Sequence, residues 1–130
     1  MLKGSKTAEN LMKSFAGECQ ARTRYTYYSS IAKKEGYIQI ANIFMETAEQ
    51  EKEHAKIFLK FLKSEYNDEE IEIKASYPVA LHEETKNNLM KAADGENAEW
   101  TKDYPQFAQI AKKEGFNKIA MAYEKIAKIE

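Results

Sequence analysis

The residues best suited to chemistry in this chain are five glutamates and one histidine that interrupt otherwise apolar stripes. At the helical spacings of three and four, the stripe in residues 40–61 consists of Ile40, Phe44, Thr47, Glu51, His54, Phe58 and Phe61. Other stripes at the same spacings contain Glu18, the pair Glu96 and Glu99, and Glu130. Because an unpaired buried carboxylate is costly, these side chains need a compensating positive charge.

Bound metal ions are the simplest source of that charge, because the four stripes contain no lysine or arginine. Carboxylates combined with an imidazole suit a pair of iron or manganese ions. Glu51 and His54 form a Glu-x-x-His motif whose two side chains share one helix face. In di-iron carboxylate bundles, two helices supply such a motif and the other two supply a single glutamate. Glu18 and Glu96 fit the single positions, and Glu130 begins the second motif.

Four helices are expected to position these side chains. Glycine and proline are few, at 5 and 2 residues, which is typical of a mostly helical chain. Gly36 and Gly115 each follow an Ile-Ala-Lys-Lys-Glu segment, as a glycine just past a helix C-terminus does. We predict helices over residues 6–35, 38–63, 79–114 and 117–130. An irregularity is expected near Gly95 or Pro105, and residues 65–77 form the only long connection.

An internal repeat indicates how the helices are connected. The sequence IAKKEG occurs at residues 31–36 and again 79 residues later, and further matches follow at the same offset. The duplicated unit is therefore a helical hairpin. Two hairpins joined by one long crossover predict an all-α, ferritin-like four-helix bundle, with an up-down-up-down bundle as the alternative. The same offset from His54 predicts a second histidine at position 133.

Composition limits the remaining possibilities. The 130 residues fit a single domain, and a net charge of −1 favours neither nucleic acid nor an anionic membrane as partner. The sequence contains neither an apolar run of transmembrane length nor a signal-peptide pattern at its start. Cys19 is the only cysteine, so no disulfide can form within the chain, and we expect a cytoplasmic protein. Cys19 itself is expected to be a small buried side chain.

The sequence resembles the rubrerythrins, a family of non-haem di-iron peroxidases. The matching stretches are FAGECQARTRYTYY, IAKKEGYIQIANIFMETAEQEKEHAKIFLKFL, AADGENAEWTKDYPQFAQIAKKEG and IAKIE. The resemblance implies that Glu51 and Glu130 bridge two irons and that Glu18 and Glu96 are terminal ligands. It also implies that Glu99 exchanges with His54 on one iron when the redox state changes. Tyr25 and Tyr104 would hydrogen-bond ligand carboxylates.

The resemblance further implies an activity and partners. The expected function is reduction of hydrogen peroxide to water in oxidative-stress defence, linked to NADH through a rubredoxin-type electron donor. Two iron ions are the expected cofactor, although manganese or zinc could occupy the same ligands. We expect a homodimer, with exchange of a helix between chains as one possible form. Relative to the family, we expect these 130 residues to lack the rubredoxin-type domain and the end of the last helix. The alternatives are ferritin-like iron oxidation and a truncated bundle that holds little metal.

Overall fold

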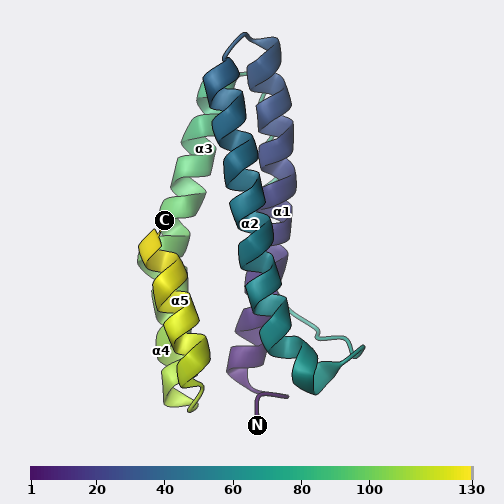
Figure 1. Ribbon diagram of the computed structural model, residues 1–130, viewed down its shortest axis with the longest axis vertical. Coiled ribbons are helices and arrows are strands. Elements are labelled where there is room, and N and C mark those ends of the chain that lie inside the picture. Colours follow the sequence, from purple (N-terminus) through teal and green to yellow (C-terminus); the bar gives the residue numbers. More distant parts are fainter. Residues whose placement is uncertain (130) are drawn as a thin grey trace.

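The computed structural model describes residues 1–129, which contain helices and no strand. The elements are α1 (Lys6–Lys34), α2 (Ile38–Tyr66), α3 (Thr85–Ala98), the π-helix η1 (Glu99–Asp103), α4 (Tyr104–Lys113) and α5 (Asn117–Ile129). Figure 1 shows α1 and α2 as one antiparallel hairpin and α3, η1 and α4 as one continuous rod beside α5. Because residues 67–84 cross from one hairpin to the other, the predicted ferritin-like arrangement of two hairpins is confirmed.

Each hairpin turns at the glycine that the sequence indicated. Gly36 and Gly115 have φ angles of +89° and +88°, values that residues with a side chain rarely adopt. Tyr37 N–H donates to the Ala32 carbonyl at 2.9 Å, and Phe116 N–H donates to Ala111 at 2.8 Å. These bonds satisfy carbonyls that the helix end leaves without a partner, so the two turns share one geometry.

The hairpins also cap each other. The Glu35 carboxylate, at the end of α1, accepts hydrogen bonds from Thr85 at the start of α3, where the N–H donates at 2.7 Å and the hydroxyl also donates. Glu114, at the end of α4, does the same for Thr7 at the start of α1, with an N–H distance of 2.8 Å. A carboxylate at a helix N-terminus satisfies orphan donors and complements the helix dipole. The repeated IAKKEG therefore supplies the glutamate that caps the opposite hairpin.

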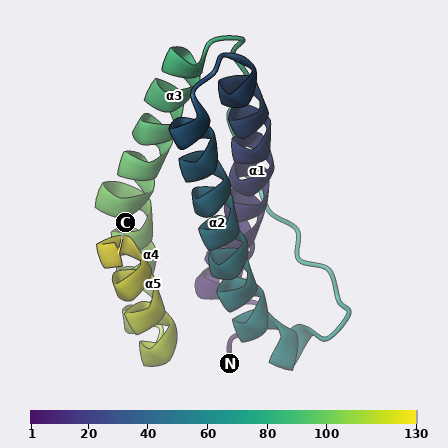
Figure 2. The same ribbon diagram turned by 45° about the horizontal axis from the view of Figure 1, so that its top comes forward.

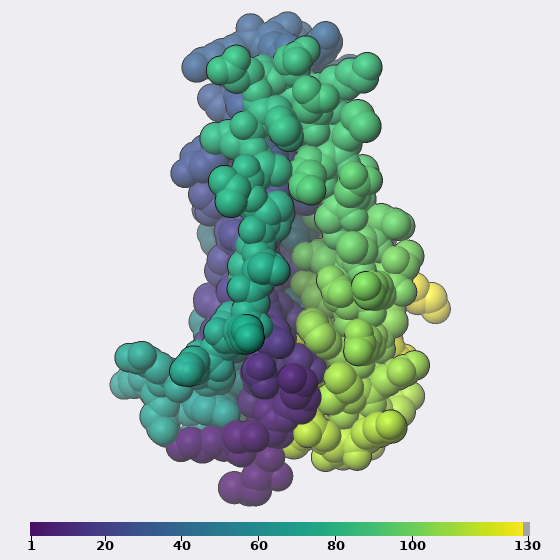
Figure 3. All heavy atoms as spheres, turned by 180° about the vertical axis from the view of Figure 1, so that it is seen from behind, coloured from purple at the N-terminus to yellow at the C-terminus, as the bar shows by residue number. Residues whose placement is uncertain are grey.

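The third helix begins later than predicted. It starts at Thr85, and residues 79–84 are non-helical, so the predicted start at 79 was wrong. Tertiary contacts keep this segment out of the helix, because Tyr28 donates its hydroxyl to the Ala80 carbonyl and the Asn88 amide pairs with the backbone of His82. Figure 3 shows the crossover, in teal, lying over the seam between α1 and the rod of α3 and α4.

The second helix ends later than predicted, at Tyr66 rather than Lys63. The ring of Tyr66 is buried in the core, and its hydroxyl accepts a 2.8 Å hydrogen bond from the backbone N–H of Gly4. The extra turn of helix therefore holds the N-terminal segment against the end of α2.

The predicted irregularity in the third helix is the π-helix Glu99–Asp103. Its origin is visible in the repeat: TAENLMK at 7–13 matches TKNNLMK at 85–91 with an offset of 78, whereas IAKKEG repeats with an offset of 79. The second copy thus has one additional residue, between Glu96 and Tyr104. A π-turn absorbs one extra residue within a helix, so the residues on both sides keep their inward orientation.

The core is divided into two apolar clusters. One surrounds Leu11, Phe58 and Tyr123, and the other surrounds Tyr28 and Phe44. In α1 and α2, the predicted glutamates and histidine lie between the residues of these two clusters. Figure 2 shows that α5 runs beside α4, whereas α3 continues beyond it along α2. No helix in residues 1–129 is long and apolar enough to cross a membrane.

Candidate metal centre

The structure brings five of the six predicted metal ligands together. Ligand atoms of Glu18, Glu51 and His54 lie within 4.8 Å of one another, and so do those of Glu51, Glu96 and Glu99. Glu51 belongs to both groups, so the two sets of three share one carboxylate. The sixth predicted ligand, Glu130, lies outside the described residues.

These side chains are withdrawn from water. Glu18 is 0% exposed, Glu51 is 1% exposed and His54 is 9% exposed, whereas Glu96 and Glu99 are partly buried. Nδ1 of His54 lies 3.3 Å from an oxygen of Glu18, so the imidazole and carboxylate face each other across α1 and α2. A concentration of buried carboxylate oxygens with one imidazole nitrogen is a donor set that suits iron, manganese or zinc. The residues present therefore fit a pair of divalent ions.

Two tyrosines hold the carboxylates in place, and they do so reciprocally. Tyr25 on the first hairpin donates its hydroxyl to Glu96 on the second at 2.7 Å. Tyr104 on the second hairpin donates its hydroxyl to Glu18 on the first. Each hydroxyl thus bonds to a predicted ligand carboxylate, and partners of this kind orient metal ligands. The supporting role of both residues stays a prediction.

Burial makes both phenols permanent donors. The pKa of Tyr25 is raised by burial first, and then by the charge of Glu96 and its hydrogen bond. The pKa of Tyr104 is raised well above its ordinary value by burial and then by the charge of Glu18. Both hydroxyls therefore remain protonated at physiological pH and can donate to the glutamates at all times.

An aromatic cluster fixes the position of Tyr104. Its ring lies 5.6 Å from Phe58 and 5.3 Å from Tyr123 between centroids. The Tyr123 hydroxyl lies 2.7 Å from that of Ser14, which donates to the Asn10 carbonyl, so Tyr123 donates to Ser14. Tyr123 is 0% exposed, and its hydroxyl bonds to Ser14 rather than to a predicted ligand. It therefore supports the site by packing against Tyr104.

Two openings lead to the carboxylates from different sides. A pocket of about 460 Å³ between α2 and α3 is lined by Glu51 and Glu96, together with Trp100. A smaller pocket, of about 190 Å³, is lined by Glu99 and Tyr104 and is bordered by Tyr77 of the crossover. Both pockets reach the set of Glu51, Glu96 and Glu99, whereas Glu18 and His54 line neither of them.

Sequence reasoning missed Tyr77 and misplaced Cys19. Tyr77 donates its hydroxyl to the Lys13 carbonyl at 2.7 Å, and its ring packs over Gly17, directly before Glu18. The one sequence signal for this contact was the presence of an aromatic residue, Tyr77, in an otherwise polar crossover. Cys19 was expected to be buried but is exposed, because it faces away from the core side of α1 that carries Glu18. Burial of part of the side chain and the nearby Glu18 raise its thiol pKa, which disfavours a thiolate.

Comparison with known proteins agrees with this geometry. The family model described as Rubrerythrin matches residues 9–130. The chain is 64% identical over 129 residues to the rubrerythrin of Clostridium perfringens, covering 99% of this chain and 66% of that protein. It is 62% identical over 130 residues to rubrerythrin-1 of Clostridium acetobutylicum, again covering 99% of this chain and 66% of the relative. The chain thus spans slightly less than two thirds of the length of these relatives.

Solved structures of nigerythrin share the fold. One, described as fully reduced and all ferrous, superposes with a TM-score of 0.80 at 32% sequence identity, covering 96% of this chain and 63% of that chain. Another, described as a mixed-valence state, gives the same TM-score and identity. The match over nearly the whole chain, in sequence and in fold, shows that this chain belongs to the rubrerythrin family.

Proposed function

We propose that the chain holds a di-iron centre and reduces hydrogen peroxide to water as an oxidative-stress protein. The observation that carries this proposal is the buried set of Glu18, Glu51, His54, Glu96 and Glu99, gathered from four elements of a rubrerythrin fold. The described nigerythrin structures, one of them all ferrous, support iron as the metal. Manganese and zinc suit the same donors and are the alternatives.

Each residue has a role in this proposal. Glu51 would bind both ions, because it alone among the described residues belongs to both sets of three, and Glu130 is the second bridging ligand that the resemblance implies. Glu18 and Glu96 are terminal ligands that Tyr104 and Tyr25 orient. His54 and Glu99 occupy different sets, which suits the predicted exchange of one ion between them.

When bound, two ferrous ions supply the two electrons that, with two protons, convert hydrogen peroxide to two waters. The chain contributes a site from which most water is excluded and phenols that stay protonated beside the ligand carboxylates. A rubredoxin-type protein or domain is proposed as the electron donor that returns the site to its ferrous state. The NADH link of that donor is part of the same proposal.

An anaerobic titration with Fe(II), followed by stopped-flow mixing with hydrogen peroxide, tests the function. The protein should bind two Fe(II) per chain and lose both ferrous equivalents on one equivalent of peroxide. Glu51→Gln should abolish this stoichiometry, whereas Glu53→Gln, an exposed neighbour on the same helix, should preserve it. Fe(II) that stays bound and unoxidised after peroxide addition would refute the peroxidase proposal. Oxidation by oxygen that is faster than oxidation by peroxide would favour the ferritin-like alternative.

A further inference from the structure

One arginine of α1 is fixed beside the phenol that donates to Glu96. The guanidinium carbon of Arg24 lies 5.7 Å from the centre of the Tyr25 ring and 5.8 Å from the centre of the Tyr28 ring. Its Nε donates a 2.7 Å hydrogen bond to Gln20, and its Nη1 donates to the Tyr28 hydroxyl at 2.8 Å. Two hydrogen bonds and two ring contacts therefore hold this partly buried side chain in one position.

These contacts belong to a chain of hydrogen bonds that follows α1 from Gly17 to the crossover. The Gln20 amide donates to the Gly17 carbonyl at 2.9 Å. At the other end of the chain, the Tyr28 hydroxyl accepts from Arg24 and donates to the Ala80 carbonyl. Because a hydroxyl that accepts from a cation becomes a stronger donor, each of these bonds supports the next. The guanidinium is thus anchored from both directions along the helix.

Tyr25 connects this arginine to a predicted metal ligand. Its side chain is 2% exposed, and its ring centroid lies 5.8 Å from that of Tyr28 and 6.0 Å from that of Phe44. A cation over the face of an aromatic ring is attracted to the π electrons and withdraws electron density from the ring. A phenol polarised in this way is a stronger hydrogen-bond donor, and the Tyr25 hydroxyl donates to Glu96 at 2.7 Å.

We propose that Arg24 is a positioning residue of the metal centre, which holds and polarises Tyr25 so that its hydroxyl stays directed at Glu96. The inference rests on the proposed metal centre and assigns that centre a further residue. A positioning role can be separated from a simple effect of charge, because a nearby cation repels a divalent metal ion. Loss of a cation that is merely near the site would raise the metal affinity, whereas loss of a positioning residue lowers it.

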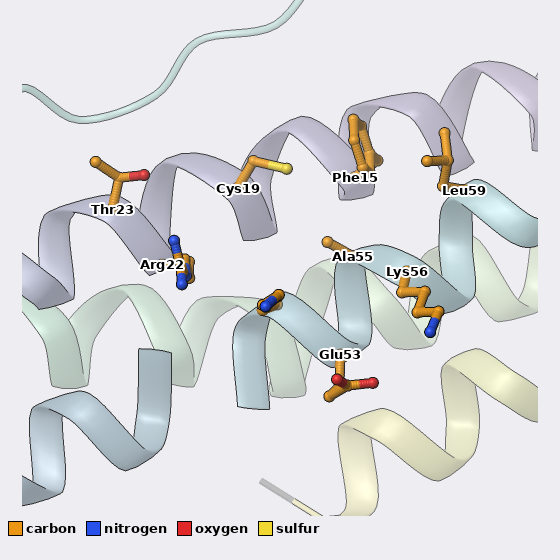
Figure 4. Close-up of a pocket in the computed structure, with 9 residues that line it drawn as sticks. Phe15, Cys19, Arg22, Thr23, Glu53, Ala55, Lys56 and Leu59 are labelled. Atoms are coloured by element: carbon orange, nitrogen blue, oxygen red, sulfur yellow. The ribbon is translucent and has the colours of Figure 1, made fainter. Parts of the chain in front are cut away.

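Arg22 is the matched control, because it is also a partly buried arginine of α1. Its Nη2 lies 3.6 Å from a carboxylate oxygen of Glu49. Figure 4 shows Arg22 in a hollow of about 590 Å³ between α1 and α2, with Cys19 and Leu59. None of the five ligand candidates that the structure describes lines this hollow. Arg22 therefore provides the same charge on the same helix, away from the site.

Co(II) titrations of arginine variants at low salt and in 0.5 M NaCl test the proposal. Arg24→Met removes the guanidinium and should lower the Co(II) affinity about threefold to tenfold, which is the size of a cation–π contact. The decrease should be larger in 0.5 M NaCl, because salt screens the opposing effect of charge. Arg24→Lys keeps the charge without the planar guanidinium, so it should restore only part of the affinity. Arg22→Met should leave the affinity unchanged or raise it.

A double-mutant cycle shows whether Arg24 acts through Tyr25. In a Tyr25→Phe background the hydroxyl is absent, so adding Arg24→Met should not lower the Co(II) affinity further. The same cycle is measured in the metal-free protein by urea unfolding. There, the loss of unfolding free energy in the double variant should be smaller than the sum of the two single losses. Circular dichroism establishes that each variant is folded.

Three results would overturn the inference while the unmodified protein binds Co(II) normally. The first is a folded Arg24→Met protein that binds Co(II) as tightly as the unmodified protein, or more tightly. The second is an equal decrease in Arg22→Met, which would assign the effect to α1 in general. The third is an Arg24→Met effect that persists undiminished in the Tyr25→Phe background. An unmodified protein that binds no Co(II) would instead refute the proposed metal centre, and this inference with it.

Discussion

Replacing Tyr104 by phenylalanine removes one hydroxyl and isolates its contribution to the metal centre. The hydroxyl donates to Glu18, whose side chain is 0% exposed, so no water can take its place. A hydrogen bond to a charged group contributes about 1.5–3 kcal/mol, and a buried acceptor left alone costs a similar amount. We therefore expect the metal-free Tyr104→Phe protein to lose about 1.5–3 kcal/mol of unfolding free energy. At roughly 4 °C per kcal/mol for a domain of this size, the melting temperature should fall by about 6–12 °C.

Tyr123→Phe is the matched control, because it removes the same atom from a neighbouring ring. Its hydroxyl bonds to the neutral Ser14 at 2.7 Å, and such a bond contributes about 0.5–1.5 kcal/mol. Urea unfolding of both variants, after chelation of metal, gives the two free energies with a check that the m-value is unchanged. With metal bound, the ion becomes a partner of Glu18, so the cost of Tyr104→Phe should decrease while that of Tyr123→Phe should not. A Tyr104→Phe protein as stable as the unmodified one, or less affected than Tyr123→Phe, would refute the reasoning.

Three further predictions concern the ligands, the turns and the caps. Tyr25→Phe should weaken divalent metal binding about 10–100-fold in a Co(II) titration, because Glu96 loses the 2.7 Å hydrogen bond that orients it. An unchanged Co(II) affinity would contradict the orienting role of Tyr25. Gly36→Ala should destabilise the protein by about 1 kcal/mol or more, because the φ angle of Gly36 is +89°. Gly95→Ala, in the interior of α3 where a methyl group meets no neighbour, should instead stabilise the protein by about 0.5–1 kcal/mol. Thermal melts compare the two variants, and equal effects would contradict the argument that the turn requires a glycine. Hydrogen bonds from Thr85 and Thr7 hold the pKa values of Glu35 and Glu114 below the usual 4.5. The two carboxylates therefore contribute their full stability above that pH, and the contribution disappears as the pH falls through the lowered pKa values. Glu35→Gln with Glu114→Gln should flatten this acid dependence in urea titrations at pH 3 to 6, whereas the exposed Glu46→Gln should not; a dependence that persists in the double variant would assign it to other groups.

The candidate ligands were readable from the sequence because helical periodicity is a local property. Charged residues at the spacing of an apolar stripe must be buried if the helix packs at all, so Glu18, Glu51 and His54 could be identified without coordinates. Repetition added the topology, since two copies of one hairpin need only a long crossover to form a bundle. The glycines after IAKKE gave the turns for a similar local reason, as both adopt positive φ.

The features that were mispredicted or missed depend on contacts between distant residues. The start of α3 at Thr85 depends on the hydrogen bond from Thr85 to Glu35 of the other hairpin and on the hydrogen bond from Tyr28 to the Ala80 carbonyl. Neither contact leaves a periodic signal at residues 79–84. The exposure of Cys19 follows from the rotation of α1 against α2, which places its neighbour Glu18 inward.

By itself, the sequence of this protein determined four helices, their pairing into two related hairpins and the carboxylates that must be compensated, because each follows from local periodicity and repetition. Only the tertiary structure decided which side chains meet: Tyr25 with Glu96, Tyr104 with Glu18, and Glu51 with both sets of ligands. The reason is physical, since a helix pattern specifies which face is buried, whereas the partner of each buried group depends on how the hairpins pack together.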